Sequence, residues 1–313
     1  MSKLVSILIP VYNAEAFVAE TIQSALDQNW PVKEVIAVDD GSTDKSCEIL
    51  KSFESAGVKL IEQDNRGASA ARNRALSEAQ GEFIQYLDAD DLMDANKIEI
   101  QMRRFNSEAQ ERVAAGAWCR FCNFPQDTEF QPENVWASLP PIDWLVASWL
   151  GGGMMPCHAW LTPRTVADKA GLWDETLGAN DDGEYFTRVL LNSSGVTFCE
   201  DARAYYRSGL SQSLSICTEP TSHESIYRSL ELCAFHLLAR EDSERTRGAC
   251  AAQYQRFIYD VYPDSLNLVR QAEEKVRELG GSELKPGGGQ LFQLTSKTLG
   301  WKTAKRIQQV VRS

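Results

Sequence analysis

Several features that would place this sequence in a common class are missing. No run of about 18 apolar residues occurs, so no segment is predicted to cross a membrane as a helix. The first apolar run is only strand length and lacks a signal-cleavage site, so we expect a cytoplasmic protein. The sequence has no GxGxxG after that run and no GxxxxGK[ST] motif. These absences exclude a dinucleotide-dependent oxidoreductase and a P-loop nucleotide hydrolase.

Cysteine is present at eight positions, but a zinc-binding arrangement is not. Cys119 and Cys122 form one CxxC, and no second CxxC or histidine pair completes four ligands. Both fall in a predicted strand, where side chains three apart point to opposite faces. We therefore expect reduced cysteines that pack as small apolar side chains.

Basic residues are scarce in most of the chain. There are 32 Lys and Arg against 44 Asp and Glu, a net charge of −12. Six of the basic residues lie in 284–313, which has no acidic residue, so residues 1–283 carry 26 basic and 44 acidic side chains, a net of −18. Phosphate backbones require Lys/Arg surfaces, so nucleic acid is not expected as a partner. A nucleotidyltransferase is also disfavoured, because residues 10–16 after the first strand contain no basic residue to bind a triphosphate.

Strand and helix patterns alternate through the first 110 residues. This alternation predicts an α/β fold with a mostly parallel central sheet covered by helices on both faces. In such sheets ligands bind beyond the carboxyl ends of the strands. The expected strands are Val5–Ile9, Glu34–Val38, Val58–Ile61 and Glu82–Leu87; the expected helices are Ala14–Gln28, Thr43–Ser55 with Ser42 or Thr43 as N-cap, Ala68–Ala79 and Ala95–Asn106.

The rest of the chain is less regular. Residues 123–156 contain five prolines and three consecutive glycines, and are expected to form a long connection that lines one side of the ligand site. Further elements are expected at Trp160–Thr162, Asp182–Leu191 and Val196–Tyr206, with two or three helices over Ser222–Leu279 and a flexible hinge over Gly280–Gly289. The predicted organisation is a catalytic domain over 1–215, a helical extension over 216–280, and a Gly-rich hinge with a basic amphipathic tail helix over 281–313.

Polar residues follow each of the first four strands. They are Pro10-Val11-Tyr12-Asn13, Asp39-Asp40-Gly41-Ser42-Thr43-Asp44, Asn65–Asn73 and Asp88-Ala89-Asp90-Asp91. One such group is typical of any turn, but parallel strands bring all four to one edge of the sheet.

Asp88 and Asp90 stand two apart at the end of a strand, in a DxD arrangement that can hold one cation between them. Hard oxygen ligands, with room left for substrate phosphates, suit Mn²⁺ or Mg²⁺. The ion would hold a diphosphate and neutralise its charge as it leaves. The alternative is capping of the following helix, for which Asp91 and Asp94 are also well placed.

With these motifs in this order, the chain resembles the inverting family 2 glycosyltransferases of the GT-A (Rossmann-like) fold. The resemblance is close over residues 3–107 and weaker to about residue 207. It implies a hexosyltransferase that uses a nucleotide-sugar donor, most often a UDP-sugar, with a divalent metal. It implies that Asp40, with Asp39 beside it, pairs with the uracil ring, and that Asp90 is the more direct metal ligand. The implied nucleotide site is Pro10, Tyr12, Asn13, Asp39, Asp40, Asn65, Arg72 and Asp88, and the implied metal site is Asp90 with Asp88.

The catalytic base is expected in the segment Asn180-Asp181-Asp182-Gly183-Glu184. An inverting transfer requires a carboxylate within hydrogen-bond reach of the acceptor hydroxyl. The segment resembles the acidic pair of the family, which puts Asp182 on the base and Asp181 beside it, near the acceptor. Capping of the predicted helix is a compatible second role for Asp181.

Two departures from the family pattern stand out. Tyr206-Arg207 is followed by serine and glycine where the family often has histidine, so water, Arg207 or a serine substitutes, or metal binding is looser. Gly183 replaces a common tryptophan, which could open the acceptor pocket. His158 has two readings, a hydrogen-bonded structural residue or an acceptor contact, with Trp160 stacking on a sugar.

The basic tail after Gln290 also has two readings. A basic amphipathic helix can lie on an anionic membrane surface, which would suit a saccharide acceptor carried on a lipid. It can equally pack on the acidic body of its own protein. For the whole chain, the runner-up to an enzyme is a non-catalytic scaffold that binds a nucleotide sugar.

Overall fold

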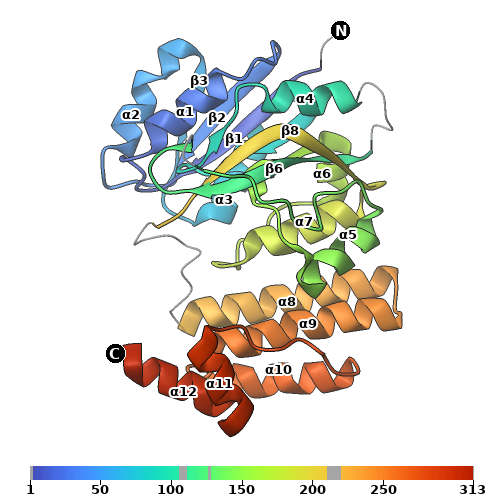
Figure 1. Cartoon of the computed structure of the whole chain (residues 1–313). Coiled ribbons are helices and arrows are strands. Elements are labelled where there is room, and N and C mark those ends of the chain that lie inside the picture. The colour runs from blue at the N-terminus through green and yellow to red at the C-terminus, as the bar shows by residue number, and fades with distance from the viewer. Residues whose placement is uncertain (1–2, 106–110, 126–127, 210–219, 313) are drawn as a thin grey trace.

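The computed structural model describes residues 3–105, 111–125, 128–209 and 220–312. A sheet with helices on both sides forms the first part of the protein, and a stack of C-terminal helices lies against one side of it (Figure 1). The N- and C-termini lie at opposite ends of the molecule (Figure 1). The expected α/β architecture with a C-terminal helical extension is confirmed.

The sheet formed by the described residues has eight strands in the order β3-β2-β1-β4-β7-β6-β8-β5. β1 to β4 run parallel, and β6 and β8 are parallel to each other. β7 lies antiparallel between β4 and β6, which keeps β6 and β8 in the direction of the first four strands. The carboxyl ends of six strands therefore meet at one edge. The strands are β1 (Val5–Val11), β2 (Lys33–Asp39), β3 (Val58–Glu62), β4 (Phe83–Tyr86), β5 (Leu92–Met93), β6 (Val113–Phe121), β7 (Trp160–Pro163) and β8 (Val196–Arg207).

Helices follow most of the strands. Those of the first part are α1 (Val18–Leu26), α2 (Ser46–Ser52), α3 (Ala68–Glu78), α4 (Lys97–Phe105), α5 (Pro141–Ala147), α6 (Arg164–Ala170) and α7 (Asp181–Leu191), with short helical turns at Glu54–Ala56, Ser148–Gly152 and Cys157–Ala159. The C-terminal helices are α8 (Pro220–Arg240), α9 (Glu244–Val261), α10 (Leu266–Glu278), α11 (Gln290–Leu299) and α12 (Trp301–Arg312).

The central strands are apolar along most of their length, whereas the helices that cover them are apolar on one face only. All seven residues of β1 are buried, as expected for a strand covered on both faces. α1 buries Val18, Thr21, Ile22 and Ala25, which share one face at helical spacing.

Two helices begin later than predicted, because their first residues bond across to the neighbouring loop. Ala14 N donates to Ser46 Oγ at 2.8 Å and Glu15 N to Asp44 Oδ2 at 3.0 Å, so α1 begins only at Val18. α2 begins at Ser46, and neither Ser42 nor Thr43 caps it. That N-cap prediction was wrong, since both residues are bonded to Asn13 instead.

The C-terminal part contains three long helices followed by a broken tail. α8 packs on α7, and α9 packs on α5 and on α10. The single tail helix that we expected is split at Gly300, whose φ of 79° is left-handed. The tail rests on the body: the Trp301 ring lies edge-on to Tyr259 and Tyr262, with centroids 4.8 and 5.2 Å away. In the described residues no helix is both long and apolar enough to cross a bilayer.

The predicted domain boundaries remain predictions, and the one at residue 215 lies outside the described residues. The expected end of the fourth helix, Asn106, also lies outside them. In the CxxC segment, Cys119 is buried in β6 and Cys122 is exposed just beyond it, so the two side chains do not share a face.

Candidate active site

Asn13 ties together the first two loops at the carboxyl edge of the sheet. Its φ of 48° is left-handed, a conformation that Asn adopts more readily than most residues. Its Oδ1 accepts a hydrogen bond from Thr43 N at 2.8 Å, and its own N–H donates to Ser42 Oγ at 3.0 Å. Next to it, Tyr12 is 52% exposed, whereas Pro10 is buried in β1. Of these predicted nucleotide contacts, Tyr12 and Asn13 are open to a ligand.

Asp39 and Asp40 are both buried at the end of β2, but their carboxylates have different partners. Three groups of the β3–α3 loop donate to Asp40: Gln63 Nε2 at 2.7 Å, Arg66 N at 3.0 Å and Gly67 N at 2.8 Å. Asp39 Oδ2 accepts one bond, from Ser42 N at 3.2 Å. Asp39 Oδ1 is buried and has no hydrogen-bond partner among the described residues. A buried polar atom without a hydrogen-bond partner costs free energy, so Asp39 is the member of the pair to which a ligand can supply the missing hydrogen bond.

Gly41 lets the second and third loops approach closely. Its φ is 73°, and a Cβ there would lie 2.9 Å from the backbone N of Asn65. Asn65 itself is exposed in the third loop, at the same edge as Tyr12. A side chain at position 41 would force these loops apart.

Arg72, on α3, joins the two acidic segments of the site. It is buried, and its guanidinium lies 4.4 Å from the ring centroid of Trp173. One terminal nitrogen donates to Asp88 Oδ1 at 2.8 Å and the other to Asp181 Oδ2 at 2.7 Å. The planar guanidinium can serve two carboxylates at once in a way that lysine cannot.

The two DxD aspartates are in different states. Burial would raise the pKa of Asp88, but the charge and hydrogen bond of Arg72 outweigh it and hold that pKa below its usual value. Asp88 Oδ2 also accepts a hydrogen bond from the Cys157 thiol at 3.1 Å. Burial, together with the charges of Asp91 and Asp88, raises the pKa of Asp90 to about 7. No hydrogen bond or ion pair from another residue to the Asp90 side chain is seen in the described structure, so no positive partner offsets its burial.

Asp181 and Asp182 begin α7. Asp181 Oδ2 also accepts from Ser69 Oγ at 2.8 Å, so its carboxylate is bound to α3 rather than free to meet an acceptor. Asp182 Oδ1 accepts from Gly183 N at 2.8 Å, and no bond to its Oδ2 is seen within the described ranges. Burial raises the pKa of Asp182 to about 6, and the neighbouring charge of Asp181 adds to the rise. Asp182 has the free oxygen and the raised pKa that a general base requires.

His158 is fully buried behind the DxD loop. Its Nδ1 lies 2.9 Å from Asp91 Oδ2, although the two atoms are not aligned for a hydrogen bond, and its ring stacks on Tyr206. Asp91 also accepts from Arg207 N at 2.7 Å. These contacts fit the structural reading of His158, and the structure does not bring its ring to the surface where an acceptor would bind.

Arg207 does not take the place of the histidine common in the family. Its Nε donates to the carbonyl oxygen of Asp90 at 2.7 Å, and a terminal nitrogen donates to Glu20 at 2.8 Å. The guanidinium also lies against the rings of Phe17 and Phe121. Arg207 therefore holds the backbone of the DxD loop, while its side chain is engaged away from the Asp90 carboxylate.

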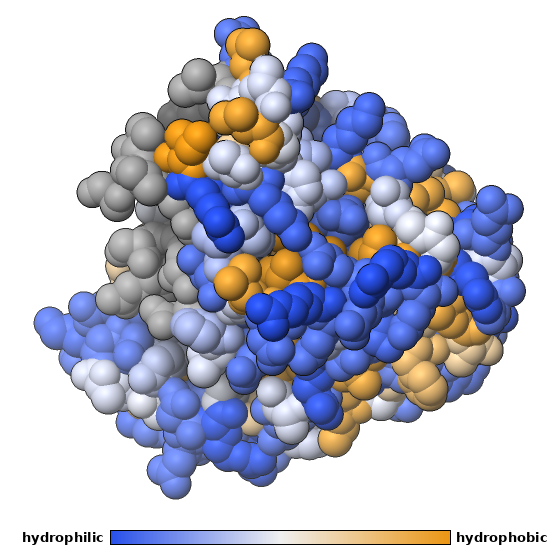
Figure 2. All heavy atoms as spheres, turned by 90° about the horizontal axis from the view of Figure 1, so that it is seen from below, coloured by the Kyte–Doolittle hydropathy of each residue, from blue (hydrophilic) through white to orange (hydrophobic). Residues whose placement is uncertain are grey.

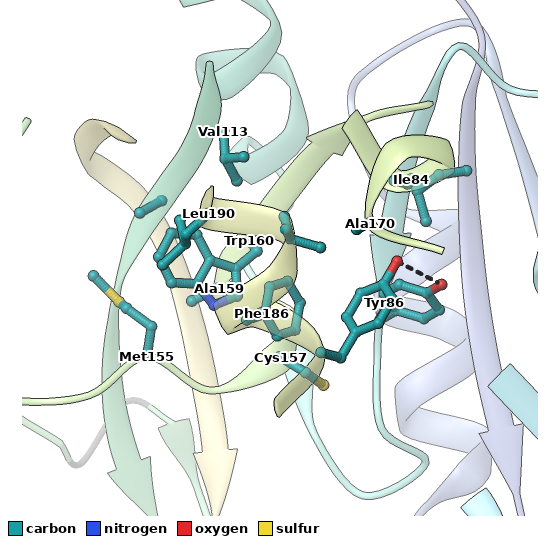
Figure 3. Close-up of a cluster of buried hydrophobic side chains, with 14 of the residues drawn as sticks. Ile84, Tyr86, Val113, Met155, Cys157, Ala159, Trp160, Ala170, Phe186 and Leu190 are labelled. Atoms are coloured by element: carbon teal, nitrogen blue, oxygen red, sulfur yellow. Dashed lines mark hydrogen bonds between the residues drawn. The ribbon is translucent and has the colours of Figure 1, made fainter. Parts of the chain in front are cut away.

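Trp160 lies in the core and not at the surface. It is 2% exposed, its ring stacks on Phe186 at 5.5 Å, and the two lie among other buried side chains (Figure 3). In this position it offers no face to a sugar. Figure 3 also shows the Cys157 sulfur pointing away from that cluster.

Three contributors to the site were missed from sequence: Cys157, Ser69 and Trp173. Cys157 and Ser69 bond Asp88 and Asp181, and Trp173 covers the guanidinium of Arg72. Ser69 falls in the predicted third loop and helix, where it could have been suspected. Nothing in the spacing of Cys157 or Trp173 points to the aspartates, because their proximity depends on the antiparallel insertion of β7.

Comparison with known proteins agrees with this geometry. A family model described as "Glycosyl transferase family 2" matches residues 6–160. Glycosyltransferase GlyG of Streptococcus pneumoniae is 40% identical over 219 residues, 66% of this chain and 71% of that protein.

A second relative is matched over a shorter stretch. The Escherichia coli UDP-Glc:alpha-D-GlcNAc-diphosphoundecaprenol beta-1,3-glucosyltransferase WfgD is 41% identical over 100 residues, 32% of this chain. The match covers only about two fifths of the length of WfgD, and the same holds for several other relatives.

Among solved structures, residues 1–349 of Staphylococcus aureus TarS, in complex with UDP-GlcNAc, superimpose with a TM-score of 0.71 at 19% identity. The match covers 88% of this chain and 81% of that one, and it shows that the two share the GT-A fold. The matches in sequence establish that the chain belongs to glycosyltransferase family 2.

Proposed function

We propose that this protein transfers a sugar from a UDP-sugar to a hydroxyl group of a saccharide or lipid-linked glycan, with inversion and with Mn²⁺ or Mg²⁺. The observation that carries the proposal is the position of Arg72 between Asp88 and Asp181. Because one buried side chain contacts both, the DxD loop and the residue before Asp182 face the same small volume. A donor diphosphate and a catalytic base would meet there.

The nucleotide would bind over the ends of β1, β2 and β3. A uracil ring has an N–H donor that matches the unpartnered Oδ1 of Asp39, and the exposed ring of Tyr12 lies at the rim of the same edge. Asp40 supports this arrangement indirectly, because it orders the third loop. The relatives favour UDP over other nucleotides, since UDP-GlcNAc is bound to TarS and UDP-Glc appears in the name of WfgD.

The acidic DxD loop fits a divalent cation. Asp90 has a carboxylate without a counter-charge, and Mg²⁺ typically takes only one or two carboxylates together with substrate phosphates. Asp90 would hold the ion directly, with Asp88 close by but already bonded to Arg72 and Cys157. When bound, the metal would stabilise negative charge on the leaving diphosphate.

Asp182 would act as the general base. Its carboxylate accepts the proton of the acceptor hydroxyl while that oxygen forms a bond to the anomeric carbon and the bond from that carbon to UDP breaks. A single displacement of this kind inverts the configuration. Arg72, which stays charged, would bind Asp181 and keep the start of α7 beside the DxD loop.

The test is UDP release from a panel of UDP-Glc, UDP-GlcNAc and UDP-Gal with Mn²⁺, with water or simple saccharides as acceptor. Asp182→Asn should lower UDP release about 10²-fold or more, as expected for loss of a general base, and should leave UDP affinity unchanged. Release by Asp182→Asn at the wild-type rate would show that Asp182 is not the base. Binding of UDP with no release by the wild type would favour a scaffold.

A lipid-linked acceptor would place the protein at a membrane surface, and the tail offers a face for it. Leu294, Leu299 and Ile307 are exposed, and 284–313 carries only positive charges. Seen from the side of the C-terminal helices, the surface is mostly hydrophilic with small hydrophobic patches (Figure 2). The protein should therefore sediment with vesicles containing anionic lipid and not with neutral ones, and Leu294→Glu/Leu299→Glu should abolish this. Equal sedimentation of the double variant would contradict membrane contact through the tail.

A further inference from the structure

The loop that leads into α7 has an unusual backbone. Asn180 occupies the N-cap position with a left-handed φ of 56°, yet its side chain makes no capping hydrogen bond. Its amide is directed elsewhere: Nδ2 donates to Ser229 Oγ, on α8, at 2.8 Å. Asn tolerates this conformation better than most L-residues, but a single loop conformation at this position still needs support from its surroundings.

That support comes from one face of α8. Ser225, Ser229 and Cys233 are spaced by four residues, so their side chains line a single stripe of the helix. All three contact the segment 178–183, which contains the start of α7. The loop before the base is thus bonded to a helix that lies some 45 residues further along the chain.

Both serines bond the loop through their hydroxyl groups. Ser225 Oγ accepts from Gly178 N and Ala179 N, each at 2.9 Å, and donates to Ala179 O at 3.0 Å. Ser229 is fully buried, and its Oγ accepts from Asn180 Nδ2 and donates to Asn180 O at 2.8 Å. A hydroxyl offers one donor and two acceptor sites, so Ser225 is saturated by this loop alone.

Gly183 completes the arrangement from the other side. A Cβ at Gly183 would lie 2.6 Å from Asn180 Oδ1, so a larger residue there would displace the Asn180 amide. The space left by the missing side chain is occupied by Asn180 and does not form an open acceptor pocket. Cys233, the last residue of the stripe on α8, contacts the Gly183 carbonyl oxygen with its Sγ at 3.6 Å.

We propose that Ser225 and Ser229 of α8 are positioning residues for catalysis, which fix the left-handed Asn180 and so aim Asp182 at the acceptor hydroxyl. This inference rests on the proposed role of Asp182 as base. It makes the first helix of the C-terminal extension part of the catalytic machinery, although α8 contributes no atom to the reaction. A small displacement of a catalytic group is sufficient to lower a rate strongly.

The experiment compares wild type, Ser225→Ala/Ser229→Ala, Ser225→Thr and the control Ser222→Ala in the full-length protein. Ser222 lies on the same helix, and no hydrogen bond of its side chain is seen in the described structure. Three quantities are measured: amide hydrogen exchange in peptides covering 178–184, UDP release from the best UDP-sugar of the panel, and UDP affinity.

The double alanine variant should exchange roughly tenfold faster at 178–184, because the lost hydrogen bonds are worth about that factor. Its UDP release should fall about tenfold or more, while UDP affinity stays within about twofold. Ser225→Thr keeps the hydroxyl and should behave as wild type, and so should Ser222→Ala.

Unchanged exchange at 178–184 in the double variant would overturn the proposal, because the serines would not be holding the loop. Faster exchange with unchanged UDP release would overturn it as well, and so would a loss of UDP affinity that accounts for the lower rate. Failure of the base assignment is recognised separately, from Asp182→Asn: if that variant keeps its activity, Asp182 is not the base whatever the serine variants do.

Discussion

Burial raises the pKa of two carboxyl groups in the site, Asp182 to about 6 and Asp90 to about 7. The two carboxyl groups differ in the positive charge that could favour their ionised forms. A cation bound at Asp90 would favour its ionised form, whereas no cationic side chain among the described residues pairs with Asp182, because Arg72 bonds to Asp181 and Asp88. At neutral pH Asp182 is ionised yet basic enough to accept a proton from a hydroxyl group.

The rate of UDP release should therefore depend on pH through Asp182. A raised pKa means that the carboxyl group keeps its proton up to about pH 6, so the rate should increase as pH rises through 6 and then level off. The profile is measured at saturating Mn²⁺, so that Asp90 is ionised throughout. Asp182→Asn should show a low rate without this limb; the same limb in that variant would show that another group is responsible.

Replacement of Asp39 and of Asp40 should separate binding from folding. Asp39→Ala removes a carboxylate that accepts one bond, from Ser42 N, and whose Oδ1 has no partner among the described residues, so it should weaken UDP binding about tenfold and lower the unfolding temperature less than Asp40→Ala does. Asp40→Ala removes the acceptor for three donors of the third loop and should lower the free energy of unfolding by about 1–3 kcal/mol. Calorimetry and thermal unfolding measure the two effects. If Asp40→Ala folded normally but no longer bound UDP, while Asp39→Ala still bound UDP, then Asp40 and not Asp39 would be the nucleotide contact.

At the level of elements, the site depends on loops that are bonded to one another rather than on helix ends. The β1–α1 and β2–α2 loops exchange hydrogen bonds through Asn13, and the third loop is held by Asp40. Gly41 is where these loops come closest. This explains why α1 and α2 begin several residues after the strands end.

Gly41→Ala should disturb this loop assembly. The left-handed φ alone costs about 1–2 kcal/mol for a non-glycine residue, and the 2.9 Å approach to Asn65 N would move the loops apart. We expect lower stability together with weaker UDP binding. Gly57→Ala is the matched control, since its φ of 94° carries the same cost but its Cβ would meet nothing within 4 Å. Equal UDP affinity in both variants would contradict a role for the Gly41 contact in the nucleotide site.

The strands and the four polar strand ends could be predicted from sequence because burial on both faces leaves a continuous apolar run, as in β1. What could not be predicted depends on contacts between distant segments. Asp40 rather than Asp39 receives the hydrogen bonds of the third loop. His158 and Trp160 are buried because β7 is inserted between β4 and β6. Loop-to-loop hydrogen bonds, such as Ala14 N to Ser46 Oγ, likewise leave no periodic signal.

At the scale of the whole molecule, the acidic body and the basic tail are in contact. Lys302 pairs with Glu273 of α10 at 2.7 Å, and Lys305 donates to the carbonyl oxygen of Tyr259 at 2.8 Å. The packed side of the tail therefore agrees with the reading in which it rests on its own protein. Its exposed leucines are what the vesicle experiment addresses.

Thermal unfolding with UDP, GDP, CMP and dTDP, each with and without Mn²⁺, would show whether the protein has a metal-dependent site for a UDP-sugar. A ligand present at about 100 times its dissociation constant stabilises the folded state by roughly 2.7 kcal/mol. We expect a shift of that size with UDP, which requires Mn²⁺ and disappears in Asp90→Ala. A larger shift with another nucleotide, a UDP shift that Asp90→Ala retains, or no shift with any nucleotide would contradict a metal-dependent UDP-sugar site.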